Sequence, residues 1–301
     1  MDVAVTGSSG LIGTALTRSL QADGHRVHRI VRRPAAGDPD AITWDPANGV
    51  LDGAALEGID AVVHLAGEGI AEKRWTDEQK QRILESRTLG TRLLAETLAG
   101  LERPPAVLVS GSAMGIYGDG GDRVLTEDSP PGDIFLSQVC VAWEAAAQPA
   151  IDAGIRVPFI RTGVVLSADG GALAKILLQF KLFAGGPMGS GRQWWSWISI
   201  DDEVAAIRWL IDHDVAGPVN LTAPAPVTYR EFAKVLGHIL HRPSFLPVPA
   251  FGPRLLLGAE LADQLLFLSQ RVEPTVLEAQ AFPFAHRDIE TALRAVLHRP
   301  A

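Results

Sequence analysis

The chain begins MDVAVTGSSGLIGTAL, and the three glycines of this segment constrain its fold more than any other feature. Residues 3–5 are a short apolar run typical of a buried strand. Residues 11–22 have the apolar spacing of a helix that ends at Gly24. A strand that passes through a tight glycine turn directly into a helix is the first half of a βαβ unit. Backbone N–H groups and the positive end of the helix dipole then converge on one point, which favours a pyrophosphate.

Each glycine of the turn has an expected role in binding a dinucleotide. Gly7 permits the tight turn, Gly10 lets a phosphate approach the backbone, and Gly13 lets the helix pack closely on the sheet. A glycine-rich turn without a ligand is the plain alternative. The turn follows an N-terminal strand, precedes a helix and has a second strand at the usual distance, which favours dinucleotide binding. The predicted contacts in this loop are Gly7, Ser9, Gly10, Leu11, Ile12 and Gly13.

Further apolar runs alternate with helical periods along the chain. Strands are predicted at residues 25–31, 61–65, 106–109 and 157–160, and an amphipathic helix at 77–98. This alternation predicts an α/β fold of the Rossmann type, a doubly wound parallel sheet with a smaller C-terminal substrate lobe. We expect a nucleotide-binding domain over residues 1–163, to which later segments can return, and a smaller lobe over 164–301. A helical appendix is expected at 247–297.

The end of the second predicted strand discriminates between cofactors. A carboxylate there would accept hydrogen bonds from a free ribose 2'-hydroxyl and would repel a 2'-phosphate. This chain has Arg32 and Arg33 instead, which offer charge-assisted contacts to a phosphate. The sequence therefore predicts NADP rather than NAD, with two solvated surface arginines as the alternative.

Composition excludes several classes of protein. The chain has 301 residues, of which 47% are hydrophobic, and a formal net charge of −8, which argues against a nucleic-acid partner. Cys140 is the single cysteine and the eight histidines show no ligand spacing, so neither a disulfide nor a metal site is expected. No signal peptide or membrane span is predicted. We expect a cytoplasmic protein that acts on a small molecule, and the sequence leaves its oligomeric state open.

The motifs after two later strands carry a family resemblance. HLAG (64–67) and SGSAMGIYG (110–118), together with TGSSGLIG, resemble the extended short-chain dehydrogenase/reductase superfamily. The segments RWTDEQKQRILESR and GGPMGSGRQWWSWISIDD are similar to its subgroup of nucleoside-diphosphate-sugar epimerases. That subgroup also has a C-terminal domain of unknown function, which residues 247–297 resemble. The resemblance covers essentially the whole chain.

The resemblance implies further cofactor contacts. Leu65, Ala66 and Gly67 are expected along the adenosine and ribose, and Arg87 is expected to approach from the following helix. Val164 is expected near the nicotinamide. Arg87 could equally be a surface charge of its helix, paired with neighbours of Glu85.

The catalytic residues that the resemblance implies are only partly present. In this superfamily a Tyr-x-x-x-Lys pair exchanges the proton, and a serine matched here by Ser112 assists it. Neither Tyr117 nor Tyr229 has a lysine four positions later, and residues 135–140 read FLSQVC where the pair belongs. The candidate substitutes are Glu127, Lys175, Lys181 and Tyr117, for each of which an ordinary surface role is favoured. Cys140 is interpreted as a small core residue.

The smaller lobe gives a weaker prediction. The glycine-rich loop at 185–191 precedes Arg192 and three tryptophans, and Arg192 and Trp195 are candidate substrate contacts. Tryptophans that anchor a core are the alternative. Asp201 and Asp202 are expected to begin a helix, with their carboxylates satisfying its free N–H groups.

Two functions remain open from the sequence. The first is an NADP-dependent oxidoreductase or epimerase-like enzyme that acts on a small hydroxylated or nucleotide-linked substrate with an altered acid/base group. The second is an NADP-binding regulator or redox sensor without turnover. The missing tyrosine and lysine favour the second, whereas Ser112 and the tryptophan-rich lobe favour the first.

Overall fold

The computed structural model describes residues 1–34 and 37–298, so residues 299–301, with which the predicted second lobe ends, lie outside the described residues. An eight-stranded sheet has the order β12-β8-β6-β5-β1-β2-β3-β4. Its neighbouring strands pair in parallel except for β3 and β4. The predicted α/β fold is confirmed. The strands are β1 (Asp2–Thr6), β2 (Arg26–Val31), β3 (Ala41–Asp45), β4 (Val50–Leu51), β5 (Ala61–His64), β6 (Val107–Ala113), β8 (Pro158–Thr162) and β12 (Gly217–Leu221).

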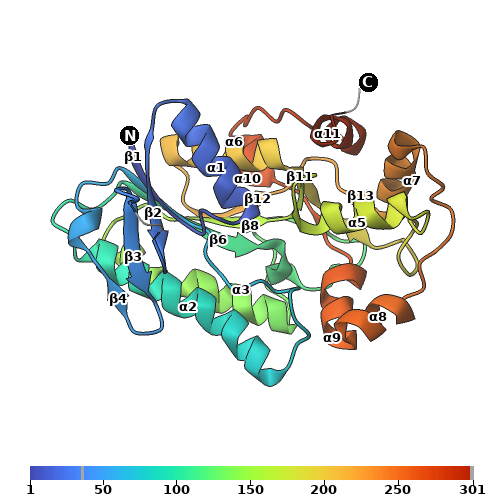
Figure 1. Ribbon diagram of the computed structural model, residues 1–301, viewed down its shortest axis with the longest axis horizontal. Helices are drawn as coiled ribbons and strands as arrows, with labels where there is room; N and C mark the ends of the chain where they lie inside the picture. Colours follow the sequence, from blue (N-terminus) through green and yellow to red (C-terminus); the bar gives the residue numbers. More distant parts are fainter. Residues whose placement is uncertain (35–36, 299–301) are drawn as a thin grey trace.

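Helices cover both faces of this sheet (Figure 1). Successive side chains of a strand point to opposite faces. Val3 and Val5 therefore share a core with Leu16, whereas Ala4 between them shares another core with Leu94. The first face is covered by α1 (Leu11–Ala22), α6 (Ile200–Asp212) and α10 (Thr275–Ala279). The second is covered by α2 (Asp77–Ala99), α3 (Phe135–Ala145) and α4 (Gln148–Asp152).

A second lobe has its own apolar core. Trp195, Trp197 and Tyr229 are buried there together with Phe180. Its elements are β9 (Val164–Leu166), α5 (Gly171–Lys181), β10 (Trp194–Trp195), β11 (Trp197–Ser199), β13 (Val227–Thr228), α7 (Tyr229–Leu240) and α11 (Ile289–Val296). The chain after residue 163 also supplies α6 and β12 to the main sheet. A domain boundary at 163 stays a prediction.

The segment between α7 and α11 carries short elements. These are α8 (Phe251–Leu257), α9 (Ala259–Ala262), a π-helical turn at Asp263–Phe267, and β14 (Arg271–Val272), which pairs with β7 (Val124–Leu125). Single helical turns occur at Ala54–Leu56 and Met114–Tyr117. Across residues 1–34 and 37–298, every helix is too short or too polar to cross a bilayer.

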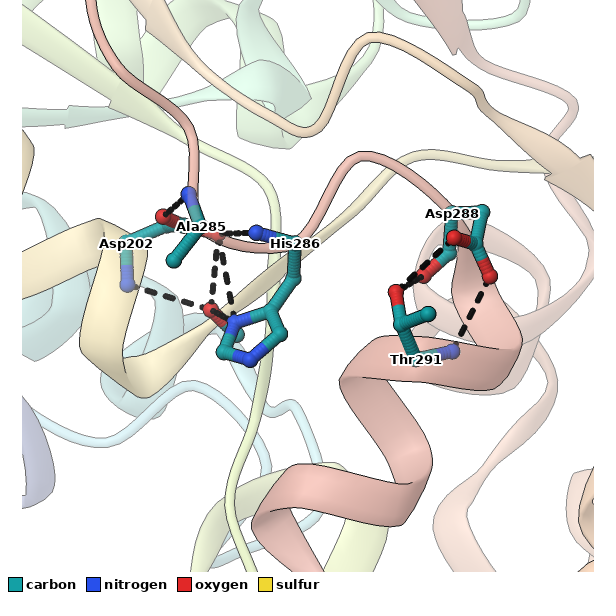
Figure 2. Close-up of polar contacts among 6 residues, drawn as sticks. Asp202, Ala285, His286, Asp288 and Thr291 are labelled. Carbon is teal, nitrogen blue, oxygen red and sulfur yellow. Dashed lines mark hydrogen bonds and ion pairs between the residues drawn. The ribbon is translucent and has the colours of Figure 1, made fainter. Parts of the chain in front are cut away.

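A buried carboxylate joins the C-terminal segment to α6 (Figure 2). The carboxylate of Asp202 accepts hydrogen bonds from the backbone N–H groups of Ala285 (2.7 Å) and His286 (3.0 Å). The His286 ring lies 3.0 Å from the Ser199 hydroxyl. That hydroxyl, and not an aspartate, accepts from the Asp202 backbone N–H and caps α6. The expectation that Asp202 caps its own helix is therefore wrong, because its side chain binds backbone some 80 residues away.

Candidate functional site

The glycine turn lies at the carboxyl end of β1 and leaves no room for larger residues. A Cβ atom on Gly7 would lie 2.8 Å from the Leu65 carbonyl carbon, and one on Gly13 would lie 2.2 Å from the Gly7 oxygen. Gly7 also has a φ of +65°, which favours glycine. No side chain caps α1 at Gly10, and its first turn holds no acidic residue. The free N–H groups at this helix end can therefore receive an anion.

A second loop, after β5, faces the glycine turn where the strand order reverses, β5-β1-β2. In open α/β sheets the ligand crevice lies outside the carboxyl ends of the strands at such a reversal, here between these two loops. The Thr6 hydroxyl accepts hydrogen bonds from the backbone N–H groups of Leu65 (3.0 Å) and Ala66 (3.1 Å). With both lone pairs engaged, Thr6 donates its proton to Nδ1 of His64 at 2.8 Å. Nε2 of His64 then carries the ring proton and donates it to Thr91 at 2.9 Å. This chain of bonds fixes the loop that faces Gly7.

The His64 ring stays neutral in this position. Burial and the nearby charge of Arg87 lower the pKa of His64 to about 4. The HLAG motif by itself indicates no role for His64. The residues that tie this loop, Thr6 and Thr91, lie on two other elements, so no local pattern indicates them.

The two arginines after β2 are free cations. Among the described residues, neither Arg32 nor Arg33 has a hydrogen-bond or ion-pair partner, and both are exposed. Arg33 lines a groove of about 490 Å³ together with Ser8 and Ser9 of the glycine turn. The groove thus joins the glycine turn to the end of β2, where a ribose 2'-phosphate would lie.

Arg87 of α2 contacts the loop after β5. Its Nη1 donates to the carbonyl oxygens of Glu68 (3.0 Å) and Ile83 (3.1 Å), and its guanidinium carbon lies 5.0 Å from the centre of the Trp143 ring. A Cβ on Gly67 would lie 3.2 Å from that carbon. Burial lowers the pKa of Arg87. Within the described part of the chain no carboxylate pairs with it, so it can attract an anionic or hydroxyl-bearing ligand.

The Ser112 hydroxyl donates its proton in a hydrogen bond to a carboxylate. Ser112 donates to Oε1 of Glu144 at 2.6 Å, and Arg161 holds the same carboxylate through bonds of 2.9 Å and 3.0 Å. Tyr117 accepts from Arg161 (3.0 Å) and donates to Asn220 (2.6 Å). Burial raises the pKa of Tyr117. Ser112 can thus accept a hydrogen bond from a substrate, whereas Tyr117 is occupied within the protein.

Apolar groups occupy the places of the expected acid/base pair. A Cβ on Gly115 would lie 3.5 Å from Cβ of Leu136 and 4.0 Å from Sγ of Cys140, so both α3 side chains face this turn. Burial raises the pKa of Cys140 to about 12, which keeps the thiol protonated. Of the candidate substitutes, Glu127 is buried and accepts from the backbone N–H groups of Asn220 and Val276. Its carboxylate thereby ties together three segments of the protein.

Five other predicted residues, two of them candidate substitutes for the acid/base pair, differ in their exposure to solvent. Lys175 and Lys181 of α5, and Arg192, are exposed, and their side chains have no partner among the described residues. Val164 is half-buried in β9, where it pairs with Trp197 of β11. Trp195 is only 8% exposed and packs against Phe232, with the ring centres 4.3 Å apart. We therefore leave Trp195 out of the proposed site.

Glu203 is a buried acid at the same edge of the sheet, and no sequence motif singles it out. The hydroxyl of Thr162, the last residue of β8, donates to its Oε1 at 2.9 Å. Its Oε2 is buried without a partner among the described residues. Burial raises the pKa of Glu203 to about 8. The sequence around it, DDE at residues 201–203, is typical of a helix start. It does not indicate which of the three acids is buried.

Two family sequence models match this chain, one over its N-terminal part and one over its C-terminal part. The sequence model of the NAD dependent epimerase/dehydratase family matches residues 3–222, and that of a domain of unknown function, DUF1731, matches residues 248–296. An epimerase family protein of Mycobacterium bovis is 44% identical over 299 residues, which cover 99% of this chain and 98% of that protein. The Bacillus subtilis epimerase family protein YfhF is 36% identical over 303 residues, which cover 99% of this chain and 98% of that protein.

A solved structure extends the similarity to three dimensions. The crystal structure of the human epimerase family protein SDR39U1, determined with NADPH, has a TM-score of 0.90 to this chain at 36% identity, with 100% of both chains covered. The resemblance predicted from the motifs, including that of the C-terminal segment, is thereby confirmed.

Proposed function

The chain belongs to the NAD dependent epimerase/dehydratase family, and we propose that it holds NADPH across the crevice between the loops after β1 and β5. The proposed activity is that of an oxidoreductase or epimerase-like enzyme acting on a small hydroxylated substrate. The similar human protein was solved with NADPH, which supports the choice of cofactor. The observation that carries the proposal is Arg33, which has no partner among the described residues and lines a groove with Ser8 and Ser9 of the glycine turn, next in sequence to the exposed Arg32.

The crevice has groups suited to each part of the cofactor. The free N–H groups at the start of α1 would hold the pyrophosphate, and Arg32 and Arg33 the 2'-phosphate. The loop of Leu65, Ala66 and Gly67 would lie along the ribose. Arg87 would supply a positive charge beside Gly67, where it can bind hydroxyl oxygens.

The residues at the sheet edge limit the proton chemistry. When bound, the nicotinamide supplies or accepts a hydride. Ser112 would orient a substrate by accepting a hydrogen bond from its hydroxyl group, because its own proton is donated to Glu144. The Glu144–Arg161 ion pair holds Ser112 in this orientation. Leu136 and Cys140 cannot provide the proton, since one has no acidic group and the other is a buried thiol.

The cofactor assignment is tested by binding titrations with NADPH and NADH. A charge-assisted hydrogen bond contributes about 1.5–3 kcal/mol, so Arg33→Ala should weaken NADPH binding by roughly 10- to 100-fold. NADH binding should not change, because NADH has no 2'-phosphate. Arg92→Ala is the matched control, since Arg92 is exposed and pairs with Glu96 on α2. An unaltered preference for NADPH after replacement of both Arg32 and Arg33 would refute the assignment.

A regulator or redox sensor remains the second candidate because the position of the acid/base pair is apolar. The two functions differ in turnover. The protein is incubated with NADPH and a panel of carbonyl compounds, while the absorbance of the reduced nicotinamide and the exchange of substrate hydrogen are followed. Oxidation or exchange with any compound supports the enzyme. Tight NADPH binding without either supports the sensor.

A further inference from the structure

Helix α5 buries one apolar face, and leucines are exposed on its opposite side and at its C-terminal end. Four side chains spaced three and four residues apart are buried in the second lobe: Leu173, Ile176, Leu177 and Phe180. The opposite stripe runs through Gly171, Lys175 and Leu178 and continues at Leu182. Leu178 is 59% exposed and Leu182 is 69% exposed. These two leucines form a candidate binding surface, whose meaning depends on its neighbours in the fold.

This stripe begins at the proposed cofactor loop. A Cβ on Gly171 would lie 3.2 Å from Cδ2 of Leu11, and one on Gly170 would lie 3.3 Å from its Cδ1. Leu11 is the first residue of α1, directly after the glycine turn. Because Gly171, Lys175 and Leu178 share one side of the helix, the stripe leads outward from the crevice.

A second group of exposed apolar residues is anchored to the other side of the crevice. Phe251, Leu255 and Leu256 of α8 are 72–75% exposed. Arg74, which follows the loop after β5, donates to the carbonyl oxygens of Leu256 (3.1 Å) and Leu255. Figure 1 shows α5 and α8 at the same end of the molecule. Exposed apolar side chains of α5 and α8 thus lie at one end of the molecule.

The charge of this region is opposite to that of the whole chain. Residues 170–200 contain Lys175, Lys181 and Arg192 and no acidic residue, whereas the chain has a net charge of −8. Lys175 lies on the stripe between Gly171 and Leu178 and has no partner among the described residues. A carboxylate or phosphate would meet a free cation there.

We propose that the substrate is an amphipathic molecule whose extended apolar chain lies on Leu178 and Leu182 and whose anionic group binds Lys175. The proposal rests on the proposed function, because the stripe is placed by its contact with the cofactor loop. The α5 stripe offers no carboxylate or amide for sugar hydroxyl groups, so it suits an acyl-type compound better than a nucleotide sugar.

The apolar part of the proposal predicts a dependence on chain length. Burial of one methylene group strengthens binding by about fourfold. Hexanoate, octanoate and decanoate are titrated calorimetrically into the NADPH-saturated protein. Affinity should rise by about fifteenfold for each added pair of methylenes. Leu178→Ser with Leu182→Ser should flatten this rise, whereas Leu89→Ser, an equally polar change at an exposed leucine of α2, should leave it intact.

The ionic part is tested separately. Lys175→Gln should weaken decanoate binding by roughly tenfold and leave the binding of decanol unchanged, because decanol carries no charge. NADPH is titrated into every variant first. Normal NADPH binding with lost decanoate binding supports the substrate proposal. Absence of NADPH binding to the wild type would contradict the proposed function, and decanoate titrated into the cofactor-free protein then tests the stripe by itself.

Several outcomes would overturn the proposal. One is an affinity that does not change with chain length in the wild type. Another is a dimer in light scattering that the α5 double variant converts to a monomer, since a second copy would then cover the stripe. Sedimentation with phosphatidylglycerol vesicles, lost in the same variant, would assign the stripe to a membrane surface. Binding of UDP-glucose that the α5 double variant weakens would assign it to a nucleotide sugar.

Discussion

Nε2 of His64 and the Thr91 hydroxyl form a buried hydrogen bond of 2.9 Å that joins β5 to α2. Through the other ring nitrogen the same imidazole holds Thr6, and Thr6 holds the loop that faces the glycine turn. The shape of one wall of the crevice thus depends on a helix that does not itself line the glycine turn.

Thr91→Val should destabilise the protein by about 1–3 kcal/mol, because it leaves the buried Nε2–H of His64 without an acceptor. Thr88→Val is the matched control, since the Thr88 hydroxyl only bonds back to the Leu84 carbonyl of the same helix at 3.1 Å. Urea unfolding measures both. Thr91→Ser should restore stability, and equal losses in Thr91→Val and Thr88→Val would contradict the assigned tautomer.

The neutral state of His64 predicts a loss of stability in acid. Its pKa is about 4 in the folded protein against a reference value of 6.5, so the unfolded chain binds more protons between these values. The free energy of unfolding should fall as the pH is lowered from 7 to 4, by at most about 1.4 kcal/mol per pH unit from this group. Urea unfolding of wild type and His64→Gln across this range isolates the contribution. A slope that persists unchanged in His64→Gln would rule it out.

Glu203 predicts the opposite slope. Its pKa is about 8 when folded against a reference value of 4.5, so the folded protein binds more protons. The stability that the protonated acid contributes is fully present below pH 4.5 and is lost as the pH rises through 8. Glu203→Gln keeps the bond from Thr162 but cannot ionise. The stability of the variant relative to wild type should therefore increase from pH 5 to pH 8.5, and a constant difference would refute the prediction.

Gly13→Ala should destabilise the fold by about 1–3 kcal/mol or more, because the added methyl group overlaps the Gly7 carbonyl oxygen. Gly252→Ala is the control: it lies in α8 and a Cβ there meets no atom within 4 Å. Thermal unfolding should show a lower midpoint for the first variant and an unchanged or slightly higher one for the second. Equal midpoints would mean that α1 can shift away from the turn.

The parts of the site that the sequence indicated are those that depend on local spacing. The glycines, the helix after them and the arginines after β2 lie within one βαβ unit, so their relative positions follow from the order of the elements. The links of His64 to Thr6 and Thr91 join residues 58 and 27 positions apart. Such pairs form only when the sheet brings its strands together, and no periodicity records them.

Where the structure differs from what the sequence indicates, the difference also has a physical reason. Asp202 stands where a helix cap is expected, but its carboxylate satisfies backbone groups of the C-terminal segment, which local sequence cannot reveal. Trp195 follows a glycine-rich loop of the kind that surrounds ligands, yet its indole packs against Tyr229 and Phe232. A buried and an exposed tryptophan have the same sequence signature. Glu144 and Arg161, which form an ion pair beside Ser112, lie on α3 and β8. These two elements come together only in the folded sheet.

The place of β12 has a consequence for how this protein can be divided. Its residues are separated from β8 by more than fifty positions, yet they complete the hydrogen bonding of that strand at the rim of the sheet. A fragment that stops after the first 163 residues would expose the backbone of β8 along its whole length and invite pairing between molecules. We therefore expect such a truncated product to aggregate, so residues 1–163 should not be separable by a single cut.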